Sequence, residues 1–143
     1  MTGTHATSCI SADGARVVVD AALAAAADLG VAVVVWVLDP GGNDVAMTRM
    51  DGSPLLSRQV AADKAWTAVA FGQETTWWSE LLTAQPPLSA LGRGNRLMPV
   101  PGGVPLVVAG AVVGGVGVSG ATSEQDHAIA RAAAQALTEM GNR

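Results

Sequence analysis

This 143-residue sequence has few of the features that mark secreted, membrane or nucleic-acid-binding proteins. One cysteine, Cys9, cannot form an internal disulfide, which agrees with a reducing compartment. No apolar run reaches the roughly 18 residues of a membrane-spanning helix, and the N-terminus lacks the pattern of a signal peptide. The eight basic residues are scattered singly and the net charge is -4, so no patch tracks a phosphate backbone. The sequence therefore predicts a cytoplasmic protein with no membrane or nucleic-acid partner.

Charged residues are also scarce, at 14% of the chain, whereas hydrophobic residues make up 50%. A chain of this length and composition has enough apolar material for the core of one domain, which we expect to span residues 1–143. A small monomer with so few charges would leave apolar surface in water, and self-association would cover that surface. We therefore expect a homo-oligomer.

Familiar catalytic and cofactor motifs are absent from the sequence. There is no phosphate-binding P-loop, no GxSxG nucleophile motif and no pair of cysteines at metal-ligand spacing. Gly115, Gly117 and Gly120 do not make a dinucleotide fingerprint, because they follow a hairpin turn instead of linking a strand to a helix in a βαβ unit. His5 and His127 form no local ligand pair, so no metal site is expected, and His127 is expected to be exposed near the start of an acidic helix.

The sequence does contain a succession of apolar segments separated by turn signals, which predicts a mixed α/β fold. Ser11 or Asp13 can cap the first helix and Gly30 can end it. The predicted elements are a helix at 11–29, strands at 31–38 and 44–50, a helix from Ser53 or Pro54 to residue 71, a short helix at 74–82, strands at 104–108 and 111–119, and a helix from Thr122 or Ser123 to about residue 140. Residues 83–101 are irregular, with a candidate short strand at 97–100.

The stretch from residue 101 to residue 126 organises this pattern as a hairpin that leads into the last helix. Ala109-Gly110 fits a tight turn between its two strands. Glycine is costly within strands, yet Gly102-Gly103 precede the first strand and Gly114, Gly115 and Gly117 interrupt the second. Such glycines indicate the close approach of either another backbone segment or a ligand, and the sequence leaves both interpretations open.

Lys64, the only lysine, lies on an apolar stripe of the second predicted helix, which ends at residue 71. A lysine in such a place loses hydration, and burial lowers its pKa. Lys64 is therefore a candidate base, anion clamp or imine former. The structural alternative is an ion pair with Asp51, Asp63 or Asp126.

Two further features lie between this helix and the hairpin. Trp77 and Trp78 point about 100° apart on a short helix, so at least one of them is expected to serve a lid, a stacking wall or a subunit contact. Arg93 and Arg96 lie in the irregular segment, where they either hold a carboxylate or phosphate together with Lys64 or remain solvated.

Four short motifs in a fixed order resemble the GlcG/HbpS-like family, whose relatives include the C-terminal domain of PduO-type corrinoid adenosyltransferases. They are RMDG at 49–52, DKA at 63–65, GGVP at 102–105, and GVSG at 117–120 followed by EQD at 124–126. The resemblance runs from about Ser11 to Leu137. It implies a profilin-like α/β sandwich with an antiparallel sheet of about five strands and helices packed against it, assembled into compact homo-oligomers.

The resemblance also implies a binding function, because relatives are described as binding haem or corrinoids, some of them as haem-degrading or redox-sensing accessory proteins. On this hypothesis a tetrapyrrole or similar planar ligand lies between the glycine-rich strand, Lys64 and the tryptophans. Its acidic groups would pair with Lys64, Arg93 or Arg96. The sequence has no tyrosine, so Met50, Met98 or a non-protein ligand would have to complete the coordination of haem iron. The cofactor-binding residues of this hypothesis are Gly102, Gly103, Ser119, Trp77, Trp78 and Arg96.

The alternative hypothesis is a cofactor-free enzyme of the isomerase, lyase or hydratase type, acting on a small aromatic or carbonyl substrate. Lys64 would act as the general base, or Lys64 and Arg49 would hold an oxyanion while Asp51 or Asp63 moves a proton.

Overall fold

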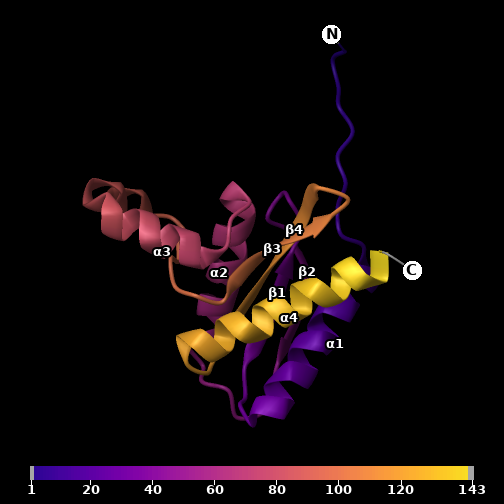
Figure 1. Cartoon of the computed structure of the whole chain (residues 1–143), viewed down its shortest axis with the longest axis vertical. Coiled ribbons are helices and arrows are strands. Elements are labelled where there is room, and N and C mark those ends of the chain that lie inside the picture. The colour runs from indigo at the N-terminus through magenta and orange to yellow at the C-terminus, as the bar shows by residue number, and fades with distance from the viewer. Residues whose placement is uncertain (1, 142–143) are drawn as a thin grey trace.

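The computed structural model describes residues 2–141, which form one four-stranded antiparallel sheet with helices on both faces (Figure 1). The elements are α1 (Ala12–Leu29), β1 (Val34–Leu38), β2 (Asp44–Arg49), α2 (Ser57–Phe71), α3 (Thr75–Ala84), the 3₁₀ helix η1 (Pro86–Gly92), β3 (Gly103–Val108), β4 (Ala111–Ser119) and α4 (Ser123–Gly141). This order confirms the predicted fold class. Ser11 caps α1 by accepting a hydrogen bond from the Gly14 N–H, and Gly30 ends the helix in the left-handed conformation.

The number of strands and several element boundaries differ from the prediction. The sheet has four strands instead of about five, because residues 97–100 do not pair with it. Pro99 and Pro101 have no N–H to donate, and a strand at this position would lack those ladder bonds. The second helix begins at Ser57 and not at Ser53 or Pro54, since the Ser53 hydroxyl turns back to donate to the Met50 carbonyl. The first strand begins at Val34, three residues later than its apolar run.

The strand order is β2-β1-β4-β3, so the glycine-rich strand β4 lies in the middle of the sheet. Helices α1 and α4 pack side by side on one face, and α2 covers the other (Figure 1). Alternate residues of a strand point to opposite faces. The buried apolar residues between the sheet and the helices α1 and α4 form the main core, which includes Val18, Ala22, Val35, Val116, Val118, Ile129 and Ala133.

The glycines of β4 explain how α2 approaches the sheet so closely. A Cβ atom on Gly117 would overlap the Ala61 carbonyl oxygen and lie 2.6 Å from the Ala65 nitrogen. A Cβ atom on Gly115 would lie 2.8 Å from the Ala65 carbonyl oxygen. Of the two interpretations of these glycines, backbone contact is therefore correct, and the strand face is covered by α2.

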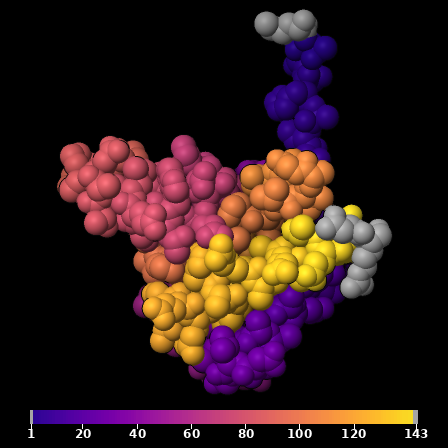
Figure 2. All heavy atoms as spheres, in the orientation of Figure 1, coloured from indigo at the N-terminus to yellow at the C-terminus, as the bar shows by residue number. Residues whose placement is uncertain are grey.

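Two segments extend from the body of the molecule. Residues 2–9 form an exposed, extended arm, attached where the Ile10 N–H donates to the Val113 carbonyl, and α3 with η1 projects on another side (Figure 2). No residue of η1 is buried. Within residues 2–141, no helix has both the length and the apolar character needed to cross a bilayer.

Candidate functional site

Lys64 is a residue of α2 whose side chain points toward the end of β4, and only 1% of its surface is exposed. Its Nζ donates hydrogen bonds to the Val118 carbonyl at 2.9 Å and to Asp126 Oδ2 at 3.2 Å. Of the three carboxylates that the sequence offered as partners, Asp126 forms the ion pair. An ammonium group has three N–H donors, so these two contacts leave one donor of Lys64 for a further partner.

Asp126 lies in the first turn of α4 and is buried with Lys64. Its Oδ1 accepts a hydrogen bond from the Ala121 N–H at 3.0 Å, which holds the carboxylate in place. Burial lowers the pKa of Lys64 from its usual 10.5, while the charge and hydrogen bond of Asp126 oppose the shift. The site therefore contains a buried ion pair whose cation is also a poorly hydrated proton donor.

A cavity of about 320 Å³ lies over this ion pair. Its apolar walls come from the segment before α2, from α2 itself and from Val100, and hydroxyl groups lie on its sides. The lining residues are Pro54, Leu56, Ser57, Val60, Lys64, Val100, Ser119, Gly120, Ala121, Ser123 and Asp126. Of the residues predicted to form the site, Lys64 and Ser119 line the cavity.

The backbone of Gly102 and Gly103 closes the back of this site. A Cβ atom on Gly102 would lie 2.8 Å from Lys64 Nζ. Only glycine therefore allows the backbone to run this close to the ammonium group. Gly102 has φ +128°, a conformation that also favours glycine. Gly103 is held from the other side, where Thr75 Oγ1 accepts from the Gly103 N–H at 3.0 Å. The predicted glycine pair thus contacts Lys64 through its backbone.

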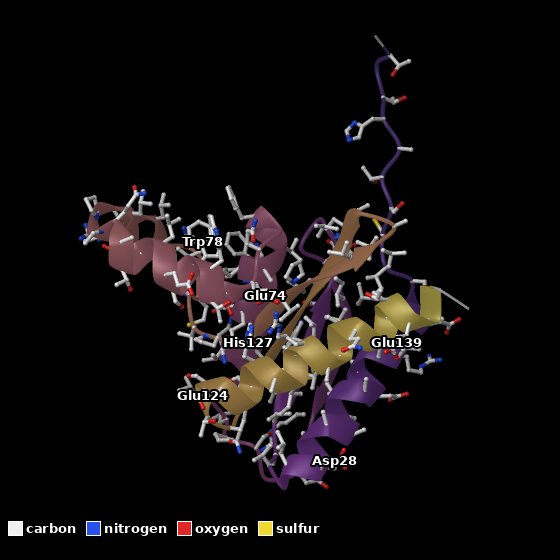
Figure 3. All side chains as sticks on the ribbon, in the orientation of Figure 1. Asp28, Glu74, Trp78, Glu124, His127 and Glu139 are labelled. Atoms are coloured by element: carbon white, nitrogen blue, oxygen red, sulfur yellow. The ribbon has the colours of Figure 1, made fainter. Side chains whose placement is uncertain are left out.

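His127 is not exposed as the sequence predicted. Its Nδ1 accepts a hydrogen bond from the Gly102 N–H at 3.0 Å, and its Nε2 lies 3.2 Å from Glu74 Oε2. Arg131 binds the other oxygen of Glu74 at 3.1 Å. Figure 3 shows Glu74 and His127 where α3 and α4 meet. The prediction was wrong because the partners of His127 lie 25 and 53 residues away in the chain, beyond any local pattern.

The other candidate catalytic residues have separate partners. Asp63 forms an ion pair with Arg96 at 3.0 Å, so Arg96 is engaged by this carboxylate. Arg49 donates to the Ser53 carbonyl at 2.9 Å. Asp51 is exposed in the turn after β2. Of the four proposed catalytic side chains, Lys64 alone lines the cavity, so the structure gives little support to a shared proton-transfer site.

Trp77 and Trp78 form an aromatic cluster with Phe71 and do not line the cavity. Trp77 stacks on Phe71 with ring centroids 5.3 Å apart, and Trp78 meets both rings edge-on. Phe71 is 61% exposed, whereas Trp78 is only 8% exposed. Within residues 2–141, the buried Trp78 Nε1 has no hydrogen-bond partner. This cluster is therefore separate from the cavity, and Figure 3 labels its Trp78 on α3.

Comparison with known proteins relates this arrangement to a described family. The family model of haem-degrading HbpS-like proteins matches residues 10–135. An uncharacterised 15.0 kDa protein of Citrobacter freundii is 35% identical over 133 residues, which cover 92% of this chain and 94% of that protein. The corrinoid adenosyltransferase PduO of the same organism is 36% identical, and the match covers 82% of this chain but only 36% of PduO.

Solved structures show the same fold at similar sequence identity. A double mutant of Streptomyces reticuli HbpS has a TM-score of 0.87 and 33% identity, with 96% of this chain and 93% of that chain covered. A crystal structure of a PduOC:heme complex has a TM-score of 0.81 and 34% identity, with 90% of this chain and 94% of that chain covered.

Proposed function

This chain belongs to the HbpS-like family, and we propose that it binds a planar small molecule with an acidic edge, of the tetrapyrrole type, at the Lys64–Asp126 cavity. The observation that carries the proposal is the buried Lys64 at the floor of the cavity, with one donor beyond those bound to Val118 and Asp126. A relative solved as a heme complex supports the choice of ligand class.

Apart from Asp126, which already pairs with Lys64, the surroundings of Lys64 suit a carboxylate. The hydroxyl-bearing residues Ser57, Ser119 and Ser123 line the cavity, and Ser123 is the first residue of α4. The N-terminus of a helix favours negative charge. Leu56 lines the cavity and is 74% exposed, so it offers an apolar surface to the ring of a ligand. We therefore place the acidic group near Lys64 and the ring against the outer wall.

The cavity fits the acidic edge of a tetrapyrrole and does not fit its iron. Among residues 2–141, no histidine, methionine, cysteine or tyrosine lines the cavity. Both ring nitrogens of His127 are engaged, and the Met50 sulfur accepts a hydrogen bond from the Val33 N–H. We therefore propose binding through the carboxylates and the ring, with no axial iron ligand from this cavity.

Self-association is part of this proposal. A cavity of about 320 Å³ is at the small end of ligand sites, so one chain would cover only part of a macrocycle. Exposed Leu55 and Leu56 beside the cavity and the exposed Phe71 of the aromatic cluster would be covered in an oligomer.

The cytoplasmic location remains a prediction from the sequence.

The alternative enzyme function has less support, because Arg49, Asp51 and Asp63 do not line the cavity and have no contact with Lys64 among the described hydrogen bonds. The binding function requires only the contacts that Lys64 and its surroundings already offer.

The test is a titration of the purified protein with haemin, followed at the Soret band. We expect saturable binding that Ser123→Glu weakens about fivefold, because a new carboxylate at the cavity repels an acidic ligand by about 1 kcal/mol. Ser123 is exposed at the start of α4, where a negative charge also suits the helix dipole, so the variant is expected to fold.

The matched control is Ser89→Glu, which adds the same charge in η1 and away from the cavity. Equal affinities of the two variants would contradict the proposed site, and a titration with no saturable shift would contradict tetrapyrrole binding itself.

A further inference from the structure

A continuous set of contacts joins the molecular surface to the buried Lys64. Arg131 binds Glu74, Glu74 contacts His127, and the Nδ1 of His127 accepts from the Gly102 N–H. The Gly102 carbonyl in turn accepts from the Val118 N–H at 2.8 Å, and the Val118 carbonyl accepts from Lys64. The Pro101–Gly103 strap, defined as these three residues, therefore lies between the imidazole and the ammonium group.

The hydrogen bonds fix the protonation state of His127. A ring nitrogen that accepts from a backbone N–H carries no proton, so Nδ1 is unprotonated and the proton lies on Nε2, where Glu74 accepts it. If Nδ1 took up a proton, its new N–H would face the Gly102 N–H. Two donors cannot bond to each other, so the hydrogen bond from Gly102 to His127 would be lost and only the bond from the Val118 N–H to the Gly102 carbonyl would remain.

The strap lies directly against Lys64. The position of a Cβ atom on Gly102 is 2.8 Å from Nζ, and Lys64 is 1% exposed. Movement of Gly102 out of the gap between His127 and Lys64 would therefore uncover the ammonium group.

We propose that His127 is the positioning residue that holds the Pro101–Gly103 strap over Lys64, and that protonation of its Nδ1 releases the strap. The device is an acid-sensitive latch: neutral imidazole keeps Lys64 covered, and imidazolium uncovers it. The inference concerns the strap and rests on the proposed function only for its consequence, the release of a bound acid when the latch opens.

The charges around the imidazole agree with such a latch. Glu74, at the N-cap of α3, faces Nε2. Arg131 pairs with Glu74, and Glu124 lines the same surface hollow as His127. The Lys64–Asp126 pair lies beyond the strap. One ring nitrogen of His127 thus contacts a carboxylate, and the other accepts from the backbone of the strap.

The experiment measures amide hydrogen exchange at Gly102 by NMR at pH 8 and pH 5.5, with no ligand present. The protection of the Gly102 amide, corrected for the intrinsic exchange rate, is expected to fall at least tenfold at the lower pH. Amides of the β1–β4 ladder serve as the internal reference. Unchanged relative protection of Gly102 would overturn the proposal.

Two variants separate the latch from a merely structural role. In His127→Asn the side-chain oxygen can still accept from Gly102 but does not titrate, so Gly102 is expected to stay protected at both pH values. In His127→Ala the strap is expected to be open at both. A fall in the protection of Gly102 in the Asn variant equal to that in the wild type would contradict the latch, and this comparison stands even if the Ala variant does not fold.

Lys64 supplies a second readout, because it is the only lysine in the protein. At pH 8 its acetylation by an amine reagent, measured by mass spectrometry, is expected to be at least fivefold faster in His127→Ala than in wild type or His127→Asn. Equal rates in all three would contradict the cover. Neither measurement involves haem, so a failed haemin titration and a failed latch are distinguishable.

Discussion

At the scale of residues, the ion pair of Lys64 and Asp126 is the feature on which the site most depends. Both side chains are buried, so a variant that removes one charge leaves the other without a partner and without water. Asp126→Asn is expected to lower the free energy of unfolding by about 3 kcal/mol, measured by urea denaturation.

The matched control for this prediction is Asp63→Asn, which removes the same charge from the Asp63–Arg96 pair. Arg96 is partly exposed, so water can replace its partner and the expected cost is below about 1 kcal/mol. Equal costs for the two variants would show that the burial of Lys64 contributes nothing to the strength of its pairing.

The pH dependence of stability provides a second test of Lys64. Burial lowers its pKa below 10.5 in the folded state, so the folded protein releases this proton at a lower pH than the unfolded chain. The contribution of Lys64 to stability therefore rises with pH between its lowered pKa and 10.5. The test compares wild type with the double variant Lys64→Met/Asp126→Leu. The unfolding free energy of wild type minus that of the variant is expected to rise between pH 8 and pH 10.5. A constant difference would contradict the lowered pKa.

How much of this site the sequence could predict depends on the range of the contacts. Lys64 was identifiable because a lone lysine on an apolar helical stripe is a local anomaly. Its partner Asp126 was one of three alternatives, since the two residues are 62 positions apart and only the fold brings them together. His127 was placed wrongly for the same reason. Its hydrogen bond to the backbone of Gly102 has no signature in side-chain pattern.

At the scale of elements, the contact of α2 with β4 decides whether the sheet can support the site. Gly117→Ala is expected to destabilise the protein by about 3 kcal/mol, because the new methyl group would overlap the Ala61 carbonyl and push α2 from the sheet. Thermal or urea unfolding measures the change.

Gly92→Ala is the control for this substitution. Nothing lies within 4 Å of a Cβ atom there, so the same change is expected to be neutral or to stabilise the protein by a few tenths of a kcal/mol. A similar loss at both positions would mean that the effect of Gly117→Ala does not come from the contact with α2.

The order of helices and strands was predictable from the sequence, because hydrophobic period and turn residues act over a few positions. Ala109-Gly110 marked the hairpin turn correctly, and both residues have positive φ. The purpose of the strand glycines was not predictable, since a covering helix and a bound ligand require the same absence of a side chain. The start of α2 was placed too early because Ser53 forms a turn with Met50 in place of a cap.

At the scale of the whole molecule, the exposed aromatic surface predicts self-association. Phe71 stacks on Trp77 and is 61% exposed, while Trp78 Nε1 is buried with no partner among the described residues. Light scattering coupled to gel filtration is expected to give a mass of at least two chains, and Phe71→Ser is expected to weaken the assembly at least tenfold.

Leu29→Ser is the control, because Leu29 is also an exposed apolar residue but lies at the end of α1. If both variants dissociate equally, or if the wild type is a monomer at high concentration, the aromatic cluster is not the surface of assembly.

In the function that we propose, the ligand is held by its acidic edge and its ring at the Lys64 cavity. The most direct measurement compares the affinities of haemin and of metal-free protoporphyrin IX for the same preparation, by absorbance and by fluorescence. We expect dissociation constants within about threefold of each other, because the described lining residues supply no ligand to iron. Binding of haemin more than about tenfold tighter than the metal-free ring, or no binding of either compound, would contradict this expectation.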